Sequence, residues 1–172
     1  FSYCDENGDL DADGICDNHD ECVGEYDECG VCNGSGPETG YDCEGIPLEF
    51  IYYSSSMQGS YFVETVTLDG IQIDNDDWVG AFNGETCVGS VQWDISQCNG
   101  GICSITVMGQ DCDPEIDDDC ENSGTYGYMI DGDIPTFKIY DASENLYHDA
   151  IPSENYPWEN FCFHLLNNLN VD

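Results

Sequence analysis

Acidic side chains alternate along the first part of the chain. Residues 5–22 read DENGDLDADGICDNHDEC, with an oxygen-bearing side chain at every second position up to Asp13. A chain that wraps a calcium ion presents alternate side chains to it, and the ion takes about six to eight oxygen ligands. Gly14 permits a sharp turn midway, and without a metal the carboxylates would repel one another. A solvated acidic run lacks this alternation. The run therefore predicts a calcium site.

The predicted ligands follow from counting along the loop. Positions 1, 3 and 5 fall on aspartates, position 7 supplies a backbone carbonyl, and positions 9 and 12 are again aspartates. We expect the two earlier oxygen-bearing residues to cap this site or to share a second ion. The predicted calcium ligands are Asp5, Asn7, Asp9, Asp11, Asp13, Ile15, Asp17 and Asp20.

The same run resembles the thrombospondin type 3 repeat, D-x-D-x-D-G-x-x-D-x-x-D-x-C. The residues that carry the resemblance are Asp9, Asp11, Asp13, Gly14, Asp17, Asp20 and Cys22. The resemblance implies aspartate ligands, a backbone carbonyl ligand, a neighbouring disulfide and little regular structure. An overlapping frame that starts at Asp5 departs from the pattern, since Leu10 replaces the glycine and Cys16 the last carboxylate.

An EF-hand is the closest alternative to this repeat. It requires a helix on each side of the loop and usually a glutamate at position 12. Four residues precede Asp5, and the segment after Asp20 is rich in cysteine and turn residues. These flanks favour the thrombospondin-like repeat over the EF-hand.

The charge of the chain restricts its partners. One Lys or Arg and 37 Asp or Glu give a formal net charge of -36. Nucleic acids and anionic membranes are excluded as partners, because both bind through Lys and Arg. Bound divalent cations or high external salt must compensate the charge. The acids cluster in 5–28, 74–77 and 111–121, which favours calcium, and we expect Lys138 to pair with an acid of its own surface.

The chain has 12 cysteines, which divide into two sets. Even numbers in each part predict two separate groups of disulfides, whose pairing the sequence leaves open. Disulfides persist in oxidising compartments, so we expect an extracellular or cell-surface protein. No apolar run approaches the length of a membrane-spanning helix. The predicted disulfide cysteines are Cys4, Cys16, Cys22, Cys29, Cys32 and Cys43 in the first set, and Cys87, Cys98, Cys103, Cys112, Cys120 and Cys162 in the second.

The texture of the sequence divides the chain into residues 1–46 and 47–172. The first part has almost no large aliphatic residues, so metal and disulfides must hold it together. The second part has short β-rich runs separated by turns, with Asn83-Gly84 as a strong hairpin signal. The predicted fold class is mainly β: a small, disulfide-rich, calcium-binding N-terminal module followed by an antiparallel β-sandwich. The predicted strands are 48–55, 61–68, 71–73, 78–82, 86–93, 102–108, 126–130, 136–140 and 161–166.

The second part resembles β-sandwich domains that adjoin calcium repeats in large secreted bacterial surface proteins. The residues that carry the resemblance lie in 77–84, 87–89 and 132–141. The resemblance implies an architecture and a location rather than an activity.

A second metal site is predicted between Cys112 and Cys120. If these cysteines pair, they close a short loop that holds Asp113, Asp117, Asp118 and Asp119 near one another. The alternative is an exposed acidic insertion. The acids at 74, 76 and 77 form a weaker candidate of the same kind.

Catalytic arrangements are not evident in the sequence. The chain has 3 His and no G-x-S-x-G, and its single base could hardly support phosphoryl transfer. A carboxylate pair for glycoside hydrolysis stays open, because so many acids give accidental pairs. We expect a protein that is not an enzyme.

The preferred hypothesis is a secreted, calcium-stabilised structural or adhesive module. A stiff calcium-bound connector joined to one sandwich suits self-assembly into an extracellular filament, or a unit of a long surface protein. The expected partner is therefore another copy of the chain. The alternative is a carbohydrate-binding β-sandwich with structural calcium, for which Trp158, next to Pro157, is the expected exposed ring.

Overall fold

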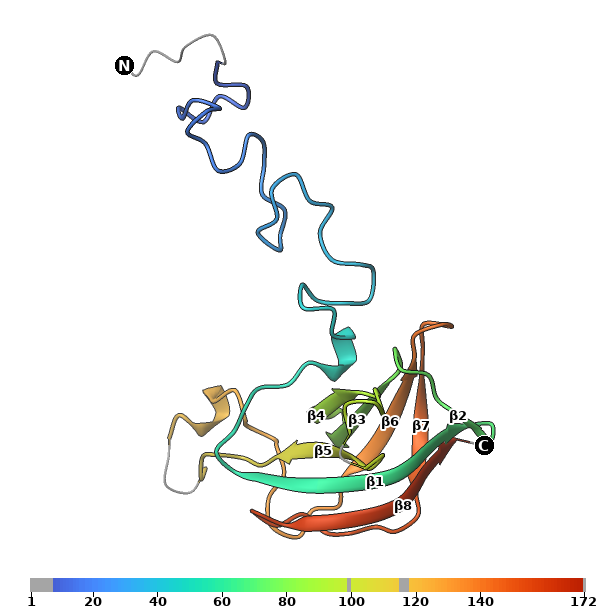
Figure 1. Ribbon diagram of the computed structural model, residues 1–172. Coiled ribbons are helices and arrows are strands. Elements are labelled where there is room, and N and C mark those ends of the chain that lie inside the picture. The colour runs from blue at the N-terminus through green and yellow to red at the C-terminus, as the bar shows by residue number, and fades with distance from the viewer. Residues whose placement is uncertain (1–7, 99, 115–117, 172) are drawn as a thin grey trace. The chain divides into compact units, whose positions relative to one another are not determined.

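The computed structural model describes residues 8–98, 100–114 and 118–171 (Figure 1). The chain divides into two compact units, Phe1–Leu48 and Glu49–Asp172. The sequence placed the boundary after residue 46, and the units divide after Leu48.

The N-terminal unit has almost no hydrophobic core. Among residues 8–48, only Cys22 and Pro47 are buried. Disulfides join Cys22 to Cys32 and Cys29 to Cys43, and Cys16 is also disulfide-bonded. Covalent links therefore take the place that apolar packing holds in a larger domain.

Two turns in this unit repeat the same hydrogen bonds. Asp27 Oδ1 accepts from the backbone N–H groups two and four residues ahead, at 3.0 and 2.8 Å. Asp42 Oδ1 accepts the equivalent pair at 3.0 and 2.7 Å. Gly30 and Gly45 follow the two aspartates by three residues and have φ angles of 73° and 79°, a backbone conformation that glycine adopts more readily than other residues. The Cys29–Cys43 disulfide joins the two turns.

The C-terminal unit is built of strands, which confirms the mainly β fold class. The elements are η1 (Leu48–Phe50), β1 (Gln58–Leu68), β2 (Ile71–Gln72), β3 (Trp78–Asn83), β4 (Thr86–Gln92), β5 (Cys103–Met108), η2 (Cys120–Asn122), β6 (Thr136–Asp141), β7 (Leu146–Pro152) and β8 (Phe163–Val171). The strand order is β2-β1-β8-β7-β6-β3-β4, and β5 pairs with β1. Asn83-Gly84 lies at the β3–β4 hairpin, as the sequence predicted.

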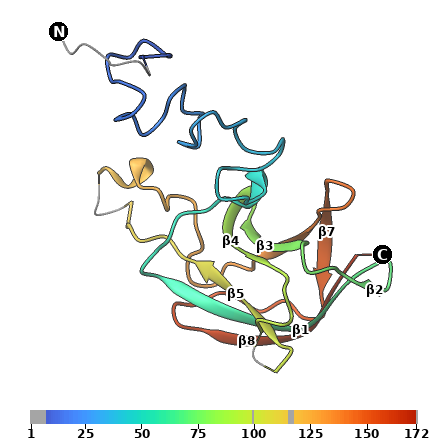
Figure 2. The ribbon, with the colours of Figure 1, turned by 45° about the horizontal axis from the view of Figure 1, so that its top comes forward.

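The sheet is mixed rather than wholly antiparallel. β1 and β8 pair in parallel, from Ser60 opposite Phe163 to Leu68 opposite Val171, and the other named pairings are antiparallel. The sheet curls, so that β5 lies between β1 and β4 (Figure 2). Within the described residues, β4 and β5 adjoin without a hydrogen-bonded ladder. We call this junction the β4–β5 seam.

The core lies between the two halves of the curled sheet. Val63 of β1, Ile105 of β5, Val79 of β3 and Ile139 of β6 are all fully buried in one cluster. Each buried aliphatic or aromatic side chain of this kind contributes about 1.5–3 kcal/mol. This unit therefore has the hydrophobic core that the N-terminal unit lacks.

Trp158 belongs to this core, so the expectation that its ring is exposed is wrong. The side chain is 1% exposed, and its Nε1 donates a hydrogen bond to the carbonyl of Val107 at 3.0 Å. The six-membered ring of the indole packs where Gly109 has no Cβ. This hydrogen bond satisfies the indole N–H, so full burial of the ring leaves no polar group without a partner.

The prediction that all the later cysteines form disulfides also needs correction. Disulfides join Cys98 to Cys103 and Cys112 to Cys120. Cys87 and Cys162 are free thiols. The thiol of Cys87 is buried and lies 3.6 Å from the carbonyl of Gly89, whereas that of Cys162 lies against Gly59 and Tyr61. The two thiols have different neighbours, and a disulfide requires adjacent ones.

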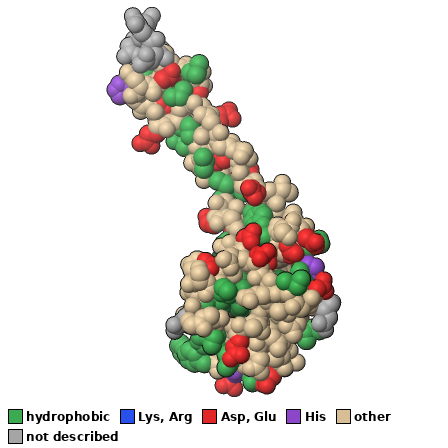
Figure 3. All heavy atoms as spheres, turned by 45° about the vertical axis from the view of Figure 1, so that its right-hand side comes forward, with side chains coloured by type: hydrophobic (Ala, Val, Ile, Leu, Met, Phe, Trp, Pro, Cys, Tyr) green, Lys and Arg blue, Asp and Glu red, His purple; other side chains and the backbone are tan. Residues whose placement is uncertain are grey.

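Acidic side chains dot the surface that Figure 3 displays. Lys138 pairs with Glu49 at 3.2 Å and lies over the ring of Phe82, so it does neutralise an acid of its own surface. No helix in the described part of the chain is long and apolar enough to cross a membrane.

Candidate metal site

The acidic run forms a closed loop held by its own backbone. The N–H of Asp17 donates to the carbonyl of Gly8 at 3.1 Å, and a turn follows in which Asp20 N–H donates to Cys16 O at 3.0 Å. Gly14 takes a φ of 97°, in the region that glycine favours. The glycine that the sequence singled out is therefore used for a turn.

Three carboxylates of this loop gather at one point. Asp9, Asp11 and Asp13 each contribute an oxygen, and these oxygens lie within 4.8 Å of one another. At such distances like charges repel, and the repulsion weakens only where solvent or a counter-ion screens it. A cation placed among the three oxygens would turn this repulsion into attraction.

Backbone N–H groups orient each of these carboxylates. Asp9 Oδ2 accepts from Gly14 at 3.2 Å, and Asp13 Oδ1 accepts from Ile15 at 2.7 Å. Asp11 Oδ2 accepts from Gly24 at 2.7 Å, which ties the loop to a residue beyond it. The hydrogen bonds fix the directions of the side chains without using all of their oxygens.

Two carboxylate oxygens of the loop are buried without a hydrogen bond. They are Oδ1 of Asp9 and Oδ2 of Asp20, for which no donor lies within reach in the described residues. A buried, unpaired carboxylate oxygen is costly. A bound cation would relieve that cost for Asp9, which belongs to the gathered group.

The remaining predicted ligands lie elsewhere or outside the described part. Asp17 Oδ1 accepts a hydrogen bond from Leu10 N–H at 2.9 Å, and Asp20 Oδ1 accepts one from Cys22 N–H at 2.9 Å. Neither belongs to the group of three. Ile15 is exposed, with its side chain 47% accessible. Asp5 and Asn7 lie outside the described residues.

The second predicted metal site is not assembled among the described residues. Asp113, Asp118 and Asp119 are exposed and do not gather in the way that Asp9, Asp11 and Asp13 do. Asp119 Oδ1 instead accepts from the side chain of Asn122 at 2.6 Å. Asp117 lies outside the described residues, so the site stays a prediction.

Sequence reasoning missed the aspartates that organise the rest of the unit. Asp27 accepts three backbone hydrogen bonds, and these, with that from Val31 the largest, lower the pKa of its carboxyl. The signal was present as a short repeat, Tyr-Asp-x-x-Gly followed by Val or Ile, which begins at Tyr26 and again at Tyr41. The repeat marks the two turns and, through its cysteines, their disulfide.

Comparison of the chain with protein-family models, with curated proteins and with solved structures finds no match. The thrombospondin-like resemblance therefore depends on the spacing of the quoted residues alone.

Proposed function

We propose that the N-terminal unit binds Ca²⁺ through Asp9, Asp11 and Asp13. The observation that carries this proposal is the convergence of three carboxylate oxygens within 4.8 Å. The buried, unpaired Oδ1 of Asp9 supports it, since a cation would satisfy that oxygen.

The donor set favours calcium over transition metals. All three side chains offer hard carboxylate oxygen, which suits calcium or magnesium, whereas zinc and copper prefer nitrogen and sulfur. In this proposal the carbonyl of Ile15 and the other predicted ligands, Asp5, Asn7, Asp17 and Asp20, would complete the larger coordination number of calcium. Extracellular modules of this type bind at about 10⁻⁴–10⁻³ M.

In this proposal calcium takes part in folding the unit. Residues 8–48 bury almost no apolar surface, so metal binding would supply free energy that a core supplies elsewhere. With the ion removed, the loop returns to a set of mutually repelling carboxylates. Calcium would thus hold the segment as a stiff connector to the β unit.

We propose a non-catalytic role for the whole chain, as a secreted structural or adhesive module that associates with further copies of itself. The described disulfides indicate an oxidising environment. β2 lies at one end of the strand order and offers backbone groups to an added strand. Because each copy carries a formal charge of -36, association would require cations.

Calorimetric titration with CaCl₂ tests the metal site. The variants Asp11→Asn and Asp13→Asn should weaken binding about tenfold or more, because each removes a charged ligand. Asp149→Asn removes an exposed aspartate from β7 and is the matched control. Equal binding by the control and the site variants, or no binding by the wild type, would contradict the proposal.

Self-association is tested by light scattering and negative-stain imaging at millimolar calcium, and again after excess chelator. We expect filaments or large assemblies that form with calcium and dissolve without it. A chain that binds calcium and stays monomeric would contradict self-assembly and leave the metal site intact.

A further inference from the structure

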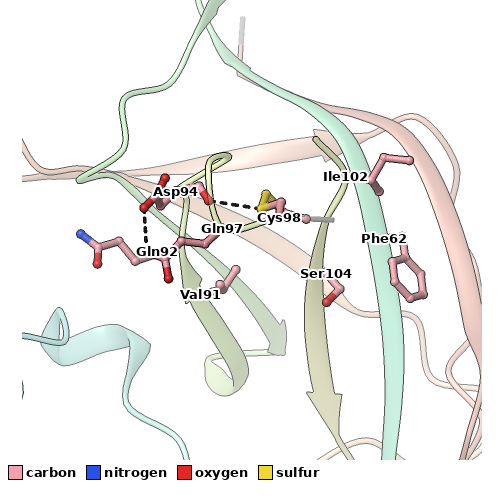
Figure 4. Close-up of a pocket in the computed structure, with 9 residues that line it drawn as sticks. Phe62, Val91, Gln92, Asp94, Gln97, Cys98, Ile102 and Ser104 are labelled. Atoms are coloured by element: carbon pink, nitrogen blue, oxygen red, sulfur yellow. Dashed lines mark hydrogen bonds between the residues drawn. A yellow bond between two sulfur atoms is a disulfide. The ribbon is translucent and has the colours of Figure 1, made fainter. Parts of the chain in front are cut away.

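The β4–β5 seam opens at one end into a cavity of about 520 Å³. Ligand-binding pockets range over about 300–1,000 Å³, so this volume would accommodate one or two sugar rings. Figure 4 shows Phe62 and Ile102 on one side of the cavity and Gln92 and Asp94 on the other. The residues used in the argument are Phe62, Val91, Gln92, Asp94, Gln97 and Ser104.

The loop that closes the cavity is held in place by its own contacts. Asp94 Oδ1 accepts from the N–H and the hydroxyl of Ser96, at 2.9 and 2.6 Å, and Asp94 Oδ2 accepts from Gln97 Nε2 at 2.6 Å. These hydrogen bonds, with the Ser96 hydroxyl first, lower the pKa of the Asp94 carboxyl, which is therefore an ionised acceptor. The Cys98–Cys103 disulfide ties the loop to β5. The site is therefore preformed, and ligand binding would not lose free energy in ordering the loop.

The lining combines an aromatic ring with uncharged polar groups. The half-buried ring of Phe62 stacks on Phe163 of β8, with ring centroids 6.3 Å apart and planes at 17°, which fixes its orientation. Val91 adds apolar surface from the β4 side of the cavity, opposite Phe62 (Figure 4). The exposed hydroxyl of Ser104 can both donate and accept hydrogen bonds, whereas the amide of Gln92 points away from the cavity. Such a surface fits a ligand whose faces are apolar and whose edges carry hydroxyl groups.

The charges around the cavity restrict the kind of ligand that it can bind. The only Lys or Arg of the chain, Lys138, is paired with Glu49 and does not line the cavity. Nothing in the lining compensates an anion, and the formal charge of -36 repels one. Both oxygens of Asp94 already accept hydrogen bonds, so an added hydroxyl donor suits it better than a desolvated cation.

From these observations we propose that the cavity at the β4–β5 seam binds an uncharged saccharide. The sugar packs a C–H face on Phe62, and its hydroxyl groups bond to Asp94 and Ser104. This site lies apart from Trp158, the ring that the sequence favoured, and it does not depend on the proposed calcium site.

A glycan array that carries neutral, sialylated, sulfated and amino sugars tests the proposal with the full chain. We expect binding to neutral glycans. The best neutral oligosaccharide is then titrated calorimetrically, and Ser104→Ala and Phe62→Leu should each weaken its binding about three- to tenfold, the range of one lost contact. Ser104 is exposed and Phe62→Leu stays apolar, so both variants should keep the thermal midpoint of the wild type.

Ser54→Ala is the matched control, because it removes the hydroxyl of an exposed serine outside this cavity. It should leave the affinity unchanged. Loss of binding in Ser54→Ala equal to that in Ser104→Ala would overturn the proposal. So would an array that detects only charged sugars, or no sugar at all. Binding that survives a chelator separates this proposal from the calcium proposal.

Discussion

Gly89 of β4 lies directly against the backbone of Thr106 of β5. A Cβ built at Gly89 would overlap the carbonyl oxygen of Thr106. The two strands share no hydrogen-bonded ladder in the described part of the chain, so this close approach is what closes the β4–β5 seam. Glycine is needed here for space rather than for its backbone freedom.

Gly89→Ala should therefore lower the free energy of unfolding by about 1–3 kcal/mol, the usual cost of overpacking. Urea denaturation of the variant and the wild type measures the change. Gly124→Ala is the control, because a Cβ there would lie 3.5 Å from the ring of Tyr53, an ordinary contact. If both alanine variants unfold at the same urea concentration as the wild type, the seam is looser than described.

Replacement by phenylalanine should destabilise the protein to different extents at its two fully buried tryptophans, Trp93 and Trp158. Trp158 Nε1 bonds to Val107, whereas Trp93 Nε1 is buried without a partner in the described residues. We expect Trp158→Phe to lower the free energy of unfolding about 1 kcal/mol more than Trp93→Phe, since only the first loses a hydrogen bond. The comparison is internally controlled, because both changes remove the same atoms. The reverse order in urea denaturation would contradict the assigned bond.

Cys87 should be unreactive in the folded protein. Burial raises the pKa of its thiol to about 11, so the nucleophilic thiolate is scarce at pH 8. In the absence of reductant, iodoacetamide should modify Cys87 in the unfolded protein and not in the folded protein, and peptide mapping detects the modification. Cys98 and Cys103 are the control, since they should label only after reduction. Labelling of native Cys87 at pH 8 would show that the thiol is accessible.

The same pKa predicts a decline of stability in alkali. The unfolded thiol ionises near pH 9 and the folded one near pH 11, so stability is complete below pH 9 and falls as the pH rises towards 11. The fall should not exceed about 3 kcal/mol for a shift of this size. Chemical denaturation at several pH values measures it, and Cys87→Ala should remove part of the decline. An identical pH profile for the variant would assign the decline to other groups.

Removal of the Cys29–Cys43 disulfide should loosen both repeated turns. A closed loop of this length contributes about 3 kcal/mol, and the N-terminal unit has almost no hydrophobic core to compensate for its loss. In the variant in which both cysteines are replaced by serine, we expect faster hydrogen exchange at the backbone amides that donate hydrogen bonds to Asp27 and Asp42. Exchange in the core strands of the C-terminal unit should stay as in the wild type.

The matched control for this experiment is the double serine variant of Cys98 and Cys103. Its disulfide closes a shorter loop within a unit that has its own core, so faster exchange should be confined to the residues between β4 and β5. Unchanged exchange around Asp27 and Asp42 in the first variant would show that their hydrogen bonds suffice.

Local patterns in the sequence predicted most of the strands. Alternation and the Asn83-Gly84 turn placed β3 and β4 within one residue of their ends. Segment 126–130 has strand-forming residues, yet only an isolated bridge between Gly109 and Met129 forms there. β7 was missed because Asp149 and Pro152 disfavour a strand, and pairing with β6 overrides that preference.

Long-range features were beyond the reach of these patterns. Segment 48–55 was predicted as a strand, but Phe50 instead packs edge-to-face on Phe82 and Tyr147. Periodicity shows which face of a strand is buried and not which strand lies beside it, so the parallel pairing of β1 with β8 could not be read.

For the candidate site, the spacing in the sequence predicted that Asp9, Asp11 and Asp13 lie close together, as they do in the structure. It could not assign their donors, because Gly24 binds Asp11 from beyond the run. Cysteine counts likewise do not reveal pairing, which depends on the positions of the Cα atoms. Cys87 and Cys162 are free because they have different neighbours in the fold, and a count does not contain that information.

The parallel pairing of β1 with β8 has a mechanical consequence. β1 begins at Gln58 and β8 ends at Val171, at opposite ends of their shared ladder. Tension applied through these ends pulls the two strands past each other along their axes. The ladder then bears the load in shear, with its hydrogen bonds strained together instead of parting one by one. Single-molecule stretching should therefore show a high rupture force, and easy unzipping would contradict this expectation.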